Sequence, residues 1–115
     1  NEAYFEKAIH HEIFHIINDT YKALFNDKKW KAFNKKSFQY SECSTCNKEW
    51  NLDLYDKTEG FLTEYAKSTA SEDMAEVFSH LMVYPNKIYN NDSIIKKKIS
   101  FIRRGILKID NTFKF

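Results

Sequence analysis

The scarcity of glycine and proline most constrains the fold of this chain. Two glycines and one proline occur among 115 residues. All-β sandwiches and barrels need many tight turns, and these two residue types build most of them. The sequence therefore predicts a mainly α-helical domain. Hydrophobic residues make up 43% of the chain and aromatic residues 17%, which is enough for one packed core at this length.

The charge of the chain is nearly balanced. Eighteen basic and sixteen acidic residues leave a formal net charge of +2, which does not favour a nucleic-acid-binding protein. No apolar run approaches the roughly 18 residues of a membrane span, so we expect none. The chain begins at Asn1 rather than at a methionine, and we expect it to be a processed or excised piece of a longer protein.

The first predicted helical segment covers residues 2–25, as one long helix or as two short ones. Its apolar residues recur at steps of three and four, which places them on one helix face. The face that we expect to be buried consists of Phe5, Ile9, Ile13, Ile16 and Ile17, followed by Tyr21, Leu24 and Phe25. A short helix is expected after Asp27.

Two further helices are predicted in the second half of the chain. One begins at a cap formed by Thr69 or Ser71 and runs to about Val83, because Pro85 cannot continue it. The last helix follows Asp92 and carries a stripe of isoleucines. Opposite this stripe we expect a solvated basic face formed by Lys96, Lys97, Lys98, Arg103 and Arg104.

The intervening segment, residues 36–62, has a different character. It is rich in polar residues, and its short alternations predict a small β-hairpin or an extended loop. Cys43 and Cys46 form a CxxC pair there, without the further ligands of a zinc site or the helix start of a redox motif. We expect loop cysteines that can pair reversibly. Residues 1–115 are thus predicted to be a single domain.

An HExxH motif carries the clearest chemistry, in His11-Glu12-Ile13-Phe14-His15. Two histidines four residues apart share a helix face and can bind one Zn²⁺. Glu12 can take a proton from a metal-activated water without binding the metal. In this composition the motif is expected by chance about 0.01 times. We therefore favour a metal site over two histidines on an ordinary amphipathic helix.

A catalytic zinc also needs a third protein ligand and one open position. Glu72 and Glu76 lie four residues apart on a predicted helix and share a face. One of them can bind the metal while the other accepts a hydrogen bond from a ligand histidine. The residues themselves do not assign the two roles, and a solvated acidic face is the alternative.

Together the two motifs resemble those of a known family. About fifty residues after HExxH comes Tyr65-Ala66-Lys67-Ser68-Thr69-Ala70-Ser71-Glu72-Asp73-Met74-Ala75-Glu76-Val77-Phe78. This order is similar to that of gluzincin-type zinc metallopeptidases, whose third ligand is a glutamate on a second helix. It resembles the catalytic domain of anthrax lethal factor and the zinc-binding metallopeptidases of bacterial lipoproteins. In both, a tyrosine lies seven positions before the ligand glutamate, which is followed by Ala-Glu-x-Phe.

The resemblance implies a zincin-like α+β fold with zinc as the cofactor. The implied zinc ligands are His11, His15 and Glu72. Glu12 would be the general base, Tyr65 would donate a hydrogen bond to the oxyanion, and Glu76 would be the supporting carboxylate. A peptide or protein substrate and a secreted or cell-envelope location are also implied.

One feature departs from the zincin pattern. In zincins the substrate pairs with the edge of a β-sheet that precedes the motif helix, and this chain has ten residues there. We expect that either residues 36–63 supply this edge or the sheet belongs to a part that is not included.

Two main hypotheses follow for the function. The first is a zinc-dependent metallopeptidase that hydrolyses peptide bonds with zinc-activated water and Glu12 as general base. Because ligand histidines must be neutral, its activity and zinc affinity should fall below about pH 6. The alternative is a non-catalytic helical binding module with a degenerate or structural metal site. A basic helical nucleic-acid binder ranks last.

Overall fold

The computed structural model describes residues 2–43, 45, 51–53, 57–87, 89 and 91–115. Its elements in chain order are α1 (Glu2–Thr20), the 3-10 helix η1 (Lys22–Leu24), α2 (Asp27–Lys31), the 3-10 helix η2 (Tyr65–Lys67), α3 (Ala70–Val83) and α4 (Ser93–Ile109). The described residues form no strand, which confirms a mainly α fold. The predicted hairpin is not seen in the described residues of 36–62, and the rest of that segment lies outside them. None of the described helices is long and apolar enough to cross a membrane.

Polar side chains cap the helices at their predicted starts. The Thr69 hydroxyl accepts a hydrogen bond from the Glu72 N–H at 3.0 Å, so Thr69 rather than Ser71 caps α3. The Asp92 carboxylate accepts one from the Ile95 N–H at 2.9 Å and caps α4. Each cap satisfies a backbone N–H that has no partner within the helix.

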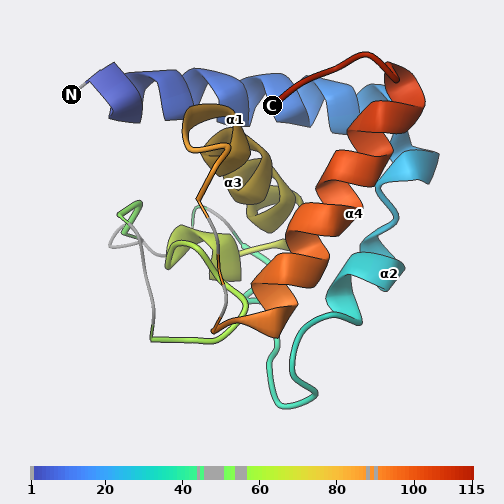
Figure 1. Cartoon of the computed structure of the whole chain (residues 1–115). Coiled ribbons are helices and arrows are strands. Elements are labelled where there is room, and N and C mark those ends of the chain that lie inside the picture. The colour runs from blue at the N-terminus through green and yellow to red at the C-terminus, as the bar shows by residue number, and fades with distance from the viewer. Residues whose placement is uncertain (1, 44, 46–50, 54–56, 88, 90) are drawn as a thin grey trace.

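The four α-helices of the described chain share one core. Figure 1 shows α1 lying across α3, with α4 and α2 to the right of α3 in this view. Each helix contributes at least one side chain with 0% exposure, namely Phe14 from α1, Trp30 from α2, Met74 from α3 and Ile102 from α4. Because α3 contacts the other three helices, its first turn is held in place from several sides.

The buried face of α1 is not the predicted one. On α1, four members of the predicted face are between 41 and 68% exposed: Phe5, Ile9, Ile13 and Ile16. The buried residues of α1 are His11 and Phe14 instead. The Phe14 ring packs against Phe25 and Phe78, and His11 reaches the carboxylates of α3. The side of α1 that faces α3 is therefore the one that carries His11 and Phe14, and most of the predicted apolar face lies at the surface.

The predicted basic face of α4 is wrong at one position, because Lys98 is fully buried. Its ammonium donates hydrogen bonds to the Gly60 carbonyl and the Asp73 carboxylate, both at 2.7 Å. Lys98 lies three residues after Ile95 and four before Ile102, so it belongs to the inward stripe of the helix. A buried lysine needs such partners, and the partners come from distant parts of the chain.

Candidate metal centre

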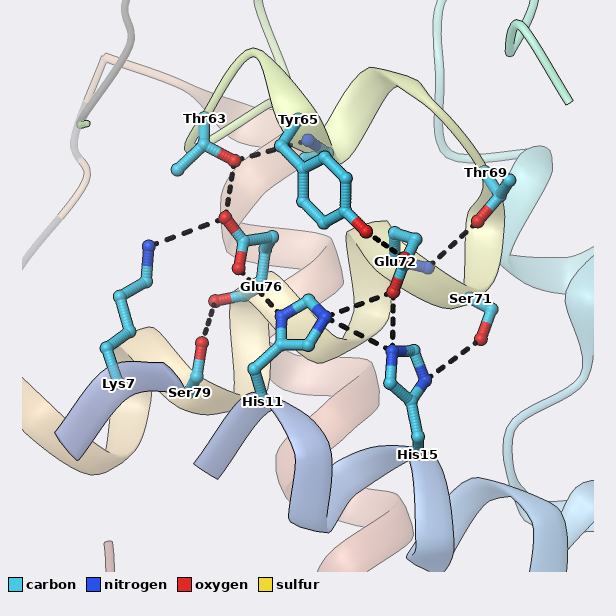
Figure 2. Close-up of polar contacts among 11 residues, drawn as sticks. Lys7, His11, His15, Thr63, Tyr65, Thr69, Ser71, Glu72, Glu76 and Ser79 are labelled. Atoms are coloured by element: carbon cyan, nitrogen blue, oxygen red, sulfur yellow. Dashed lines mark hydrogen bonds and ion pairs between the residues drawn. The ribbon is translucent and has the colours of Figure 1, made fainter. Parts of the chain in front are cut away.

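Two helices bring three donor atoms together. His11 and His15 lie one turn apart on α1, and Glu72 lies in the first turn of α3. The Nε2 atoms of the two imidazoles are 3.1 Å apart. Glu72 Oε1 lies 3.0 Å from His11 Nε2 and 2.5 Å from His15 Nε2. Figure 2 shows both rings pointing from α1 towards this oxygen. The three predicted ligand side chains therefore converge on one point.

The other nitrogen of each imidazole also faces α3. His11 Nδ1 donates a hydrogen bond to Glu76 Oε2 at 2.8 Å. His15 Nδ1 lies 3.3 Å from the hydroxyl oxygen of Ser71. Glu72 therefore faces Nε2 of His11, and Glu76 faces Nδ1. The spacing of the two glutamates in the sequence could not assign these two positions. The role of Ser71 at the second histidine does not follow from the sequence motifs.

Glu76 is itself held by two partners. Its Oε1 accepts a hydrogen bond from the Thr63 hydroxyl at 2.6 Å, and the Lys7 ammonium lies 3.5 Å away. Thr63 Oγ1 in turn accepts from the Ala66 N–H at 3.2 Å, which ties the carboxylate to the turn before α3. The sequence motifs identify neither partner. Lys7 lies four residues before His11 on the same helix face, whereas no spacing connects Thr63 with Glu76.

Tyr65 and Glu12 both lie close to this centre. The Tyr65 hydroxyl donates a hydrogen bond to Glu72 Oε2, and its ring centroid is 5.9 Å from that of His11. Glu12 is exposed, and the donor atoms of His11, Glu12 and His15 all lie within 4.8 Å of one another. Glu72 Oε1 lies 3.0 Å or less from Nε2 of both histidines. Glu72 rather than Glu12 is therefore the carboxylate positioned as the third ligand.

The charges in this centre stabilise each other. Burial disfavours a charged imidazole, but hydrogen bonds to Glu72 and Glu76 outweigh burial and raise the pKa of His11 to about 9. Burial also opposes the ionised carboxylates, yet hydrogen bonds from the histidines hold the pKa of Glu72 and of Glu76 below the usual range. A metal cation at His11 Nε2 would take the place of the proton that this nitrogen shares with Glu72.

The donor set fits zinc. Zn²⁺ takes imidazole nitrogen and carboxylate oxygen at about 2.0–2.2 Å, so the ligands of a tetrahedral ion lie about 3.3 Å from each other. The three separations here are 2.5, 3.0 and 3.1 Å, and small outward movements of the side chains would admit the ion. The outer nitrogens already have the oxygen partners that orient ligand histidines in metal sites.

The remaining histidines and the CxxC pair lie outside this centre. His10 packs edge-on against Phe78, and His80 is buried with its imidazole hydrogen-bonded to the Tyr89 hydroxyl. Cys43 is disulfide-bonded, and Cys46 lies outside the described residues.

Comparison with known proteins agrees with the metal centre. A sequence family described as "Putative zinc-binding metallo-peptidase" matches residues 1–109. No curated protein and no solved structure matches the chain, so the similarity to the catalytic domain of lethal factor stays a prediction. The family match covers nearly the whole chain, including both helices of the metal centre. The chain therefore belongs to this family of zinc-binding metallopeptidases.

Proposed function

We propose that the chain is a zinc-dependent metallopeptidase domain in which His11, His15 and Glu72 bind the metal. The observation that carries the proposal is the convergence of His11 Nε2, His15 Nε2 and Glu72 Oε1 within 2.5 to 3.1 Å. Three protein ligands leave a fourth position of a tetrahedral zinc for water or substrate, as catalytic rather than structural zinc sites require.

The chain's own residues supply the proton transfers. When bound, zinc acts as a Lewis acid that makes water a nucleophile at neutral pH and polarises the scissile carbonyl. The exposed carboxylate of Glu12 accepts the proton of the attacking water and delivers it to the leaving amine. The Tyr65 hydroxyl, next to Glu72, donates a hydrogen bond to the oxyanion of the tetrahedral intermediate.

Two side chains of α3 orient the ligand imidazoles. Glu76 accepts the Nδ1 proton of His11, which leaves Nε2 free to bind the metal as a neutral imidazole. The Ser71 hydroxyl lies 3.3 Å from Nδ1 of His15 and would accept its proton when Nε2 binds the metal. The Glu76 carboxylate, which can only accept, fixes the tautomer of His11, and both contacts fix the direction of their rings.

The test of this proposal is the metal content of the purified chain together with peptide hydrolysis. About one zinc per chain is expected, and its loss in both His11→Ala and Glu72→Ala. Glu12→Gln should keep the zinc and lose hydrolysis of a casein-derived peptide mixture, because Glu12 is a base and not a ligand. Glu6→Gln, an equal change at another exposed position of α1, should keep both.

The outcomes separate the two functional hypotheses. A wild-type chain that takes up no zinc at neutral pH would contradict the metal site. Zinc that is bound by these ligands without any hydrolysis would instead favour the non-catalytic binding module. Hydrolysis that persists in Glu12→Gln would leave the site in place and exclude Glu12 as the base.

A further inference from the structure

A hollow of about 430 Å³ lies between η1, α2 and α4, apart from the metal centre. Its apolar lining includes Leu24, Phe33 and Phe101. The Phe33 and Phe101 rings meet edge to face with their centroids 5.6 Å apart, so one wall of the hollow is aromatic. Binding sites for small organic molecules have this character, with volumes of roughly 300–1,000 Å³ and mostly apolar walls.

Small residues form part of the lining of the hollow. Gly105 lies on α4 and lines the hollow, and a Cβ atom built on it would lie 2.4 Å from the ring of Phe25. The packing of Phe25 in the core therefore requires glycine at this position. Ala23 and Ala32 add two further small side chains to the lining.

All charged residues that line the hollow are basic. Lys29 approaches from α2, while Arg104 and Lys108 lie one turn apart on α4. All three are exposed, and none forms an ion pair with a carboxylate of the described residues. A cleft lined by charges of one sign concentrates the field and attracts counter-ions. Cations from two helices thus face one apolar space without a negative partner.

We infer that this hollow is a binding site for a small organic anion that carries an apolar ring system or chain. The aromatic wall and the apolar floor would take the ring or chain. The guanidinium of Arg104 and the ammonium groups of Lys29 and Lys108 would pair with a carboxylate, sulfonate or phosphate head group. The site is independent of zinc and of the proposed peptidase reaction.

The site can be tested with two fluorescent probes that differ by one charged group. Both 8-anilinonaphthalene-1-sulfonate and the neutral N-phenyl-1-naphthylamine have a naphthalene and a phenyl ring, but only the first carries a sulfonate. The double variant Arg104→Gln/Lys108→Gln should weaken binding of the sulfonate about tenfold at low ionic strength and leave the neutral probe nearly unchanged. Ala32→Trp, which fills the hollow, should weaken both.

Lys96→Gln/Lys97→Gln is the matched control. It removes the same charge from exposed positions of the same helix that do not line the hollow, so the sulfonate should bind as to the wild type. Equal losses in both double variants would show a general charge effect and overturn the site. Unchanged sulfonate binding in Arg104→Gln/Lys108→Gln would overturn it as well, because the probe would then occupy another surface.

The glycines provide a direct readout of location. The chain has two glycines, so a sample labelled with ¹⁵N-glycine gives two amide signals. Adding ¹³C-arginine identifies Gly105, because Arg104 precedes it and Glu59 precedes Gly60. The sulfonate probe should shift the Gly105 signal and leave that of Gly60 in place. A titration that leaves Gly105 unmoved, or moves both signals equally, would contradict the proposal.

Discussion

The ammonium of Lys98 and the carboxylate of Asp73 are 2.7 Å apart, and neither side chain is exposed to solvent. The same oxygen, Asp73 Oδ2, accepts hydrogen bonds from the Tyr40 hydroxyl at 2.6 Å and from Trp30 Nε1 at 3.0 Å. Asp73 directly follows Glu72, so this buried ion pair anchors the turn of α3 that carries the proposed third zinc ligand.

Replacing Lys98 by methionine should destabilise the fold strongly. Burial raises the pKa of Asp73 and lowers that of Lys98, so each charge depends on its partner. Removing one partner of a buried pair typically costs about 3–5 kcal/mol. Urea unfolding measures the loss, and Lys97→Met at the exposed neighbouring position should change stability by less than about 0.5 kcal/mol. Adding Asp73→Asn to Lys98→Met should recover part of the loss, and equal midpoints for the two lysine variants would refute the prediction.

Glu76→Gln should weaken zinc binding without removing a ligand. The neutral amide is a weaker acceptor for the His11 Nδ1 proton than the carboxylate, and mutation of such a partner typically costs about 10–100-fold in metal affinity. Competition with a zinc chelator measures the change. Thr63→Val, which removes the hydroxyl next to Glu76 with little change of shape, should act in the same direction but more weakly. An affinity equal to that of Glu6→Gln would argue against a supporting role for Glu76.

Tyr65→Phe should lower kcat about 10²-fold while zinc content and KM change little. This is the pattern for a group that interacts mainly with the oxyanion of the intermediate. The hydroxyl also contacts Glu72, so a different pattern is informative. If zinc affinity falls as much as kcat, Tyr65 acts by orienting the Glu72 carboxylate and not by contacting the substrate.

His80 should make the fold less stable in mild acid. Burial, followed by the positive charges of Lys7 and Lys87, lowers the pKa of its imidazole from 6.5 to about 4. Between these values the unfolded chain binds a proton that the folded chain excludes, so acidification favours unfolding. The contribution of His80 is present above pH 6.5 and is lost as the pH falls towards 4, by about 3 kcal/mol in total.

Urea unfolding at several pH values from 7 to 4.5 tests this pH dependence. His80→Gln removes the titrating group, so the difference in stability between wild type and variant should shrink as the pH falls. A difference that stays constant over this range would contradict the role of His80. Histidines elsewhere, including His11 with its raised pKa, contribute equally to both chains and cancel in the comparison.

Much of the local structure could be predicted from the sequence. The start of α4 after Asp92, the end of α3 before Pro85 and the helical spacing of His11 and His15 all follow from residues within a few positions of each other. The cap of α3 was narrowed in the same way to Thr69 or Ser71. The candidate ligand set was found in the same way, with the resemblance needed to choose Glu72. Helix caps and helix periodicity are local properties, because the hydrogen bonds that define them span three or four residues.

The isoleucine stripe of α4 is buried as the sequence predicts, but only the tertiary structure decided which side of α1 is buried and what the buried polar groups contact. The exposed isoleucines of α1, the buried Lys98 and the bond from Thr63 to Glu76 depend on partners that are far away in the chain. Lys7 and Glu76, for example, are 69 positions apart. Apolar periodicity predicts a face but not its partner, and a polar side chain is buried only where packing supplies the donors and acceptors that replace water.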